Sequence, residues 1–167
     1  MSRNRLAGMA AAVFIMVAAT AWTAIPQGKG LLTEKAISTD MAITMAQAAI
    51  AKCRADNYHV SVHVMDADGM DKVAIRDDGS GEVNFTVSKQ KAFTALTYKR
   101  PSSVTEKALA NMSPARIIPG IFAVGGGLPI KVGDEVIGAI GVGGAPGSDK
   151  DEACAQAGLD KVADLLK

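Results

Sequence analysis

The sequence predicts an α+β domain in which helices cover an antiparallel sheet. Two observations carry this prediction. Alternating apolar runs are folded back on themselves by turn residues at two places, and segments with helical spacing precede, separate and follow these two hairpins. The order helix, hairpin, helix, hairpin, helix puts consecutive strands side by side, so we expect them to pair antiparallel.

The first 24 residues have the organisation of a secretory signal peptide. A basic start is followed by an uncharged, alanine-rich run from Leu6 to Ala21, which is shorter than the ~20 strongly apolar residues that a spanning helix needs. Cleavage is expected after Ala21 or after Ala24, with a membrane anchor as the competing interpretation. The sequence therefore predicts a periplasmic or secreted protein without a stable membrane anchor.

Length and charge indicate one domain and exclude a nucleic-acid function. Residues 25–37 mix proline, glycine and lysine without periodicity and are interpreted as a linker, and residues 38–167 are long enough to bury a single core. The chain has a formal net charge of +1 and loses two arginines with the expected signal peptide. No basic field then remains to attract a nucleic acid.

The first helix is expected from Asp40 to about Asp56, with Ser38 or Thr39 as its start signal. Its buried face is predicted from an apolar stripe at helical spacing, made of Ile43, Ala46, Ile50 and Cys53. The following segment, Tyr58 to Met65, alternates apolar and polar residues as a strand does. Its three valines, Val60, Val62 and Val64, are expected to share one face of the sheet.

Turn residues and composition place the next elements. Asp66 to Gly69 is expected to fold the first strand back onto a second one, Lys72 to Arg76. Phe85 to Tyr98 contains no glycine or proline and is predicted as the second helix, which ends before Arg100-Pro101. A shorter helix is expected around Val104 to Ala110.

A glycine-rich hairpin and a last helix complete the domain. Gly133-Asp134 is expected to form the tight turn of this hairpin, and Gly138 and Gly141 are expected to let a backbone, a helix or a flat ligand approach its second strand. Asp149 and Glu152 have the spacing of a capping box that opens the last helix. The apolar face of that helix is predicted to contain Ala155, Leu159, Val162 and Leu166.

Cys53 and Cys154 are the two cysteines of the chain. In an oxidising compartment they can pair if their Cα atoms come within about 7 Å. The alternative is that both are small buried apolar residues on helix faces. Neither has a Cys or His partner at ligand spacing, so no metal site is expected from them.

Several motifs occur in the order and spacing of a known family. They are Asp66-Ala67-Asp68-Gly69, Lys91 to Ala95 followed by Arg100-Pro101, Pro119-Gly120, Gly126 to Ile130, Gly138 to Val142 and Asp151 to Cys154. Through them the chain, from Ser38 to Leu166, resembles the GlcG/HbpS-like heme-binding proteins, also described as a heme-degrading domain. Two positions depart from the family pattern, because members usually have Ser where Gly143 stands and often Arg where Lys89 stands.

The resemblance implies a profilin-like fold with a five-stranded antiparallel sheet, heme as the cofactor, and assembly as a homo-oligomer. The expected function is an exported heme-binding protein, with oxidative heme degradation and heme or iron sensing as related activities. Binding is favoured over enzymatic activity. One alternative is a small-carboxylate-binding accessory domain or enzyme, and another is a structural oligomeric partner of a periplasmic redox enzyme.

A heme site needs an apolar slot, cations near the propionates and usually a side chain on the iron. His59 and His63, the only histidines, are the candidate axial ligands, at most one per heme per chain, because residues four apart on a strand are separated by about 13 Å. The alternative is that both are structural.

The other candidate residues lie on or just after the second helix. The candidates for cofactor binding there are Lys89, Lys91, Thr94 and Arg100. The cations are suited to propionates or another small carboxylate, with an ordinary solvated helix face as the alternative. Thr94 is either a weak oxygen ligand or a helix hydroxyl bonded to the carbonyl one turn back. No catalytic residue is predicted, because the chain has no nucleophile elbow.

Overall fold

The computed structural model describes residues 30, 32–111 and 118–167. One compact unit runs from Glu34 to Lys167. Its elements are, in chain order, α1 (Thr39–Ala55), β1 (Ser61–Asp66), β2 (Asp71–Arg76), α2 (Glu82–Tyr98), α3 (Ser102–Leu109), β3 (Gly127–Val132), β4 (Glu135–Gly143), α4 (Ser148–Lys161) and the short 3-10 turn η2 (Ala163–Leu165). No helix in these ranges has the length and apolar character needed to cross a membrane.

The sheet has the strand order β2-β1-β4-β3, and all neighbouring strands are antiparallel. The predicted α+β class and both hairpins are confirmed. The five strands implied by the resemblance are wrong for the described residues, which form four. Between α3 and β3, side chains of α2 and α3 bond to the described backbone: Phe122 N–H donates to Thr94 Oγ1 (2.9 Å), and the Val124 carbonyl accepts from Ser102 Oγ (2.7 Å).

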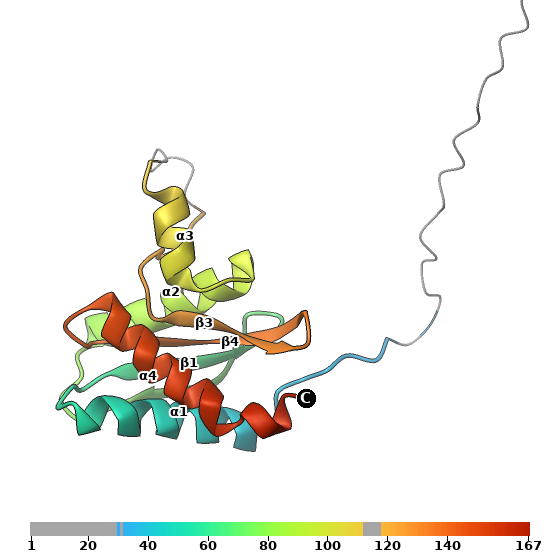
Figure 1. Ribbon diagram of the computed structural model, residues 1–167, viewed down its shortest axis with the longest axis horizontal. Helices are drawn as coiled ribbons and strands as arrows, with labels where there is room; N and C mark the ends of the chain where they lie inside the picture. Colours follow the sequence, from blue (N-terminus) through green and yellow to red (C-terminus); the bar gives the residue numbers. More distant parts are fainter. Residues whose placement is uncertain (1–29, 31, 112–117) are drawn as a thin grey trace, which may run out of the picture. The chain divides into compact units, whose positions relative to one another are not determined.

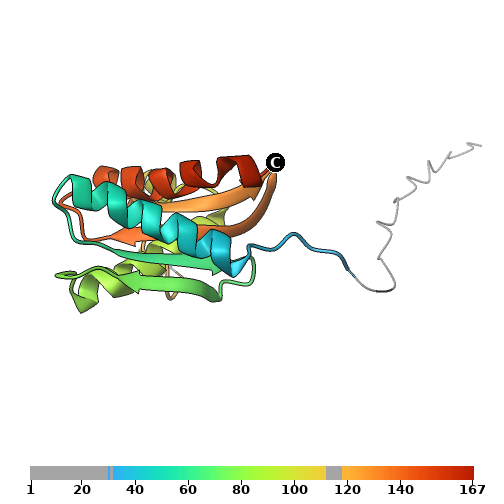
Figure 2. The ribbon, with the colours of Figure 1, turned by 90° about the horizontal axis from the view of Figure 1, so that it is seen from below.

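Helices cover both faces of the sheet, as Figure 1 shows, with α1 and α4 together on one face and α2 on the other. Figure 2 shows the α1 and α4 layer lying along the strands. The larger apolar core lies between the sheet and this layer, and it contains the predicted valine face of β1. A smaller core lies between the sheet and α2, made of Met65, Ala92, Ala95 and Ala139.

Helix α1 starts as its sequence predicts, because Ser38 Oγ accepts the Met41 N–H (3.2 Å) as an N-cap. The buried face, however, is rotated relative to the predicted stripe. Ile43 is 36% exposed. The buried positions are Ala42, Met45, Ala46, Ala49, Ile50 and Cys53. The helix has to contact both the sheet and α4, so its small residues face these two neighbours and the large Ile43 turns away.

The glycines of the second hairpin allow α2 to lie directly on the sheet. A Cβ on Gly141 would be 2.1 Å from the Ser88 carbonyl oxygen, and a Cβ on Gly127 would be 2.1 Å from the Lys91 carbonyl oxygen. Of the two glycines for which a close neighbour is predicted, Gly141 meets helix α2, and Gly138 meets the backbone of β1, since a Cβ on Gly138 would be 2.3 Å from the Met65 carbonyl oxygen. This hairpin is therefore covered in the folded chain and offers no seat for a flat ligand at these positions.

The capping box predicted for the last helix is wrong. Helix α4 begins at Ser148 with Gly147 as its N-cap residue, and no side chain caps it. Asp149 therefore already lies within the first turn. Glu152 turns toward α3 instead, where its Oε1 accepts a hydrogen bond from Ser103 Oγ (3.0 Å). The Glu152 carboxylate, which the capping-box pattern assigns to the N-cap, is therefore bonded to α3.

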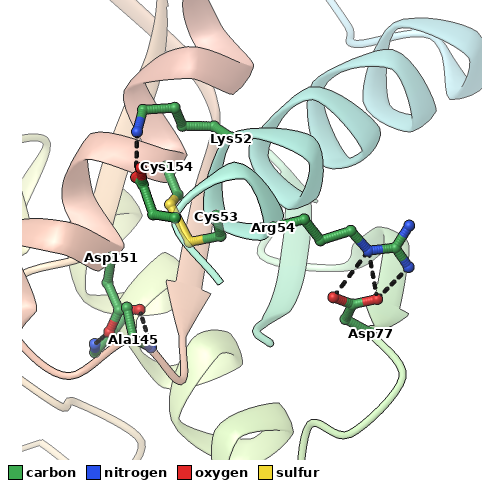
Figure 3. Close-up of a disulfide and its surroundings, with 9 residues drawn as sticks. Lys52, Cys53, Arg54, Asp77, Ala145, Asp151 and Cys154 are labelled. Atoms are coloured by element: carbon green, nitrogen blue, oxygen red, sulfur yellow. Dashed lines mark hydrogen bonds and ion pairs between the residues drawn. A yellow bond between two sulfur atoms is a disulfide. The ribbon is translucent and has the colours of Figure 1, made fainter. Parts of the chain in front are cut away.

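Cys53 of α1 and Cys154 of α4 form a disulfide, with their Cα atoms 5.6 Å apart (Figure 3). Both residues are buried. Next to them in Figure 3, Arg54 binds the carboxylate of Asp77 in the loop after β2. The C-terminal end of α1 is thus attached to α4 by a covalent bond and to the β2–α2 loop by an ion pair.

Candidate functional site

The two histidines lie in different environments. His59 is exposed just before β1, and its Nδ1 lies 3.4 Å from Asp77 Oδ2. His63 lies within β1 and is 1% exposed. Its ring contacts the edge of Phe85 at a centroid distance of 4.4 Å. Only His59 is accessible to solvent, and it already has an acidic neighbour.

Hydrogen bonding sets the tautomer of His63. Ser88 Oγ donates to the Phe85 carbonyl (2.8 Å) and lies 2.9 Å from His63 Nδ1. Because the single hydroxyl hydrogen is used for the carbonyl, Ser88 accepts from Nδ1–H. Burial lowers the pKa of His63, while Asp71 opposes this change and Lys89 adds to it. His63 is a neutral imidazole held under α2.

The predicted basic residues do not form one cluster. Lys91 is 3% exposed, and its Nζ lies 2.6 Å from Asp151 Oδ2 of α4. Lys89 is exposed and pairs with Asp71 at 2.6 Å. Arg100 donates from Nε to Thr105 Oγ1 (3.1 Å). Each cation therefore has its own partner, in a different part of the fold.

The Lys91–Asp151 pair connects α2 with α4 around the end of the sheet. Asp151 Oδ1 also accepts the Ala145 N–H (2.9 Å), a contact drawn in Figure 3. Burial raises the pKa of Asp151, and Lys91 and the backbone hydrogen bonds partly offset that rise. The pair is a structural link and leaves Lys91 no access to a ligand at the surface.

Thr94 is fully buried and uses its hydroxyl twice. Its Oγ1 donates to the Gln90 carbonyl one turn back (2.7 Å), the alternative considered for this residue, and it accepts the Phe122 N–H (2.9 Å). The second bond was not predicted. It attaches the chain segment before β3 to the C-terminal half of α2.

That segment and α3 enclose a largely apolar pocket. The pocket, which we call the apolar hollow, has a volume of about 450 Å³ and is lined by Glu106, Leu109, Ala110 and residues 121–124. Phe122 is 37% exposed at its surface. Glu106 is the one charged residue in this lining, and its Oε2 accepts the Gly125 N–H (3.2 Å).

A separate polar groove shares the residue Glu106 with the apolar hollow. This α3–α4 groove of about 500 Å³ is lined by Ser103, Glu106, Lys107, Ser148, Asp149, Glu152, Ala153 and Gln156. Glu152 Oε2 is buried and has no hydrogen-bond partner among the described residues. Three carboxylates against one lysine make the lining of this groove acidic.

A smaller hollow of about 240 Å³ adjoins the same segment at Gly120. It is lined by Met65, Gly69, Lys89, Gln90, Phe93 and Gly120. Of the predicted site residues, Lys89 lines this hollow. Leu109 and Phe122 are not among the site residues predicted from the sequence, although the apolar run at Ile121-Phe122, in a connection with turn residues on both sides, is a usable signal.

The comparisons with known proteins bear on this arrangement. Residues 37–160 match the family described as "Haem degrading protein HbpS-like". The chain belongs to the HbpS-like family. It is also similar to Protein GlcG of Escherichia coli (strain K12), with 29% identity over 111 residues, which cover 66% of this chain and 83% of GlcG.

Solved structures agree with this membership. The crystal structure of HbpS matches with a TM-score of 0.75 and 34% identity, over 81% of this chain and 96% of that one. The crystal structure of the PduOC:heme complex matches with a TM-score of 0.67 and 21% identity, over 76% of this chain and 95% of that one. The second likeness shows a shared fold. The predicted family is thus confirmed for this HbpS-like chain.

The bond between Thr94 and Phe122 gives a testable consequence for the wall of the apolar hollow. Thr94→Val keeps the shape of the side chain but leaves the Phe122 N–H without its acceptor. We expect the free energy of unfolding to fall by about 1–2 kcal/mol, and amide exchange in residues 118–124 to become faster. Urea unfolding and hydrogen-exchange mass spectrometry measure the two effects. Thr94→Ser, which keeps the hydroxyl, is the control, and equal exchange in Thr94→Val and wild type would show that the bond does not hold the segment.

Proposed function

We propose that this protein binds heme, and that the macrocycle enters the apolar hollow between α3 and residues 121–124. The observation that carries the proposal is the lining of this hollow, which is aliphatic and aromatic apart from Glu106 and lies in the size range of small-molecule sites. The description of the matched family, which names haem, and the fold shared with a protein solved as a heme complex support it.

The lining of the apolar hollow suits the macrocycle of heme better than it suits the two propionates. Leu109, Ile121 and Phe122 supply apolar contacts for a flat macrocycle. Among the described lining residues of the hollow none is a lysine or arginine, and the α3–α4 groove, which shares Glu106 with it, is acidic. Like charges repel, so the propionates are directed away from Glu106 and toward solvent.

Bound heme would supply an iron centre that takes dioxygen or peroxide chemistry. The protein residues would hold the ring and exclude water from the part of it that is inserted. Oxidative degradation belongs to the proposal as a reaction of heme that is already bound, with the outward edge open to reductant and oxidant. Heme or iron sensing would use the same binding step.

The proposal places the protein in the periplasm or outside the cell. The signal-peptide pattern of residues 1–24 supports export. The Cys53–Cys154 disulfide supports it as well, because such bonds persist in oxidising compartments.

Homo-oligomer formation stays a prediction. The alternative of a small-carboxylate site built on the basic residues of α2 is not proposed, because Lys89 and Lys91 each have an acidic partner.

The test places a charge in the hollow. Leu109→Asp puts a carboxylate next to the ring, so we expect hemin to bind about tenfold more weakly or worse, measured by titration of the Soret band. Val83→Asp is the matched control, because Val83 is 69% exposed on α2 and lines none of the hollows described.

The dimethyl ester of hemin tests the predicted orientation. If the propionates face solvent, the ester binds wild-type protein with an affinity comparable to that of hemin. Equal hemin affinity of Leu109→Asp and Val83→Asp would contradict the apolar hollow as the site. No saturable binding by wild-type protein would contradict the proposed function itself.

A further inference from the structure

We infer that two copies of this chain form a symmetric dimer through the flank of α1 that borders β2, with the two α1 helices antiparallel. The inference goes beyond the proposed heme function and does not depend on it. It assigns a contact surface to the predicted homo-oligomer. Figure 1 shows α1 on the opposite side of the fold from α3, so this flank is separate from the apolar hollow.

A groove lies between α1 and β2, the edge strand of the sheet that the described residues form. This α1–β2 groove has a volume of about 490 Å³ and is lined by Gln47, Ile50, Ala51 and Arg54 of α1 and by Ile75 of β2. Ile50 is almost fully buried and Ile75 is half-buried, so the groove has an apolar floor. Its shape and lining suit an apolar side chain that enters from outside.

Ile43 is the side chain of α1 that fits this role. It lies one turn before Gln47 on the same flank of the helix, and it is 36% exposed although it is large and apolar. Ile43 and Ala51 are four residues before and after Gln47, about 6 Å on each side. When two α1 helices lie antiparallel with their Gln47 residues facing, Ile43 of each copy is opposite Ala51 of the other. A large side chain then meets a small one at the groove, and the contact occurs twice.

The charges of α1 favour the same arrangement. Asp40 and Arg54 lie seven residues before and after Gln47 on this flank, about 21 Å apart along the helix axis. An antiparallel pair brings Asp40 of each copy to Arg54 of the other at both ends of the contact. A parallel pair would place like charges together, which repel. The charge pattern is therefore complementary to itself in the antiparallel orientation alone.

Arg54 can bind a second carboxylate while it keeps its own partner. Its Nε and Nη2 atoms donate to Asp77, and its side chain is 55% exposed. The Nη1 hydrogens remain for Asp40 of the second copy. Lys52, the other charged residue between the two ends of the contact, lies off this flank and pairs with Asp56. The ion pairs at the ends of the contact thus compete with no neighbouring lysine.

The contact surface is already rigid in the single chain. The disulfide of Cys53 holds the C-terminal end of α1 against α4, and the bond between Arg54 and Asp77 holds it to the loop after β2. Docking therefore orders little of the chain, which lowers the entropic cost of association. At the symmetry axis, the amide of each Gln47 can donate to and accept from the other.

The first test places a charge at the apolar part of the contact. Ile43→Asp puts one carboxylate into the groove of each copy, so we expect the dissociation constant of the dimer to rise about a hundredfold or more. Sedimentation equilibrium measures this constant. Val83→Asp, at an apolar position of α2 that is 69% exposed, is the matched control and should leave the constant unchanged.

Asp40→Lys keeps the test decisive if circular dichroism shows that Ile43→Asp does not fold. Asp40 is exposed in the first turn of α1. Its reversed charge repels Arg54 of the second copy at both ends of the contact. We expect a dissociation constant about tenfold higher than that of wild type, and a smaller difference at high salt, which screens exposed charges.

A crosslink tests the predicted register. Gln47→Cys places two thiols at the symmetry axis, so mild oxidation should join two chains into a covalent dimer on a non-reducing gel. Gln156→Cys, the same substitution at an exposed position of α4, is the matched control and should crosslink far less. Cys53 and Cys154 are already paired with each other and do not compete.

Three results would overturn the inference. They are a wild-type protein that sediments as a monomer at all concentrations, an assembly that Ile43→Asp and Asp40→Lys leave intact, and equal crosslinking of Gln47→Cys and Gln156→Cys. None of these measurements involves hemin. The inference and the proposed heme function can therefore fail independently.

Discussion

Removing the Cys53–Cys154 disulfide is expected to lower the free energy of unfolding by about 4 kcal/mol. The two cysteines are separated by 101 residues. A crosslink that closes a loop of this length removes many conformations from the unfolded chain, and this is the main source of the stabilisation in the chain-entropy account. Urea unfolding of oxidised wild type and of the double variant Cys53→Ala, Cys154→Ala measures the difference.

The control for this prediction is the addition of a reductant. It should shift the unfolding midpoint of the wild type toward that of the double variant and leave the double variant unchanged. Both cysteines are buried, so part of the loss in the variant comes from the missing sulfur atoms. Coincident midpoints for oxidised and reduced wild type would show that the crosslink does not stabilise the domain.

Lys91→Met is expected to cost about 3–5 kcal/mol of unfolding free energy, because it leaves the carboxylate of Asp151 buried without its cation. Lys91 and Asp151 are each about 3% exposed. Lys89→Met is the matched control on the same helix. It breaks an ion pair whose lysine is exposed, and it should change stability by less than about 1 kcal/mol.

The double variant Lys91→Met, Asp151→Leu removes both charges and should regain much of the stability lost in Lys91→Met. Chemical unfolding of the four proteins measures these differences. If Lys91→Met and Lys89→Met had the same small effect, the buried pair would not be a stabilising link between α2 and α4.

The pH dependence of the Lys91→Met deficit follows from the raised pKa of Asp151. A folded-state pKa above the unfolded value means that the folded chain holds the proton more tightly, so this group favours folding below the unfolded pKa and loses that contribution as pH rises through the folded pKa. Removing Lys91 raises the pKa of Asp151 further. The deficit of the variant relative to wild type is therefore expected to shrink as the pH is lowered. Asp77, whose pKa Arg54 lowers, acts in the opposite sense but is common to both proteins.

The features that the sequence predicted well depend on local rules. The cap at Ser38, the β1–β2 turn and the tight turn at Gly133 involve residues that are close along the chain. The errors arose where a distant element intervened. Glu152 binds Ser103 of α3 in place of a cap, and Ile43 turns outward because α1 has two neighbours.

The candidate site was harder to predict than the fold. Lys89 and Lys91 are two positions apart on a helix, and such residues do not face each other, which is why one pairs with Asp71 at the surface and the other with Asp151 in the interior. The apolar hollow combines the end of α3 with residues 121–124, which have no regular structure and therefore no periodicity to read.

The disulfide crosslinks the helix layer on one face of the sheet only. The disulfide joins α1 to α4, the two helices of one layer, and makes no connection to α3 or to residues 121–124. Those parts are held by noncovalent contacts alone, such as Thr94 with Phe122 and Ser102 with Val124. Local opening on that side has a lower free-energy limit than opening of the crosslinked layer. Under the proposed function, the face without the crosslink is the one that carries the apolar hollow.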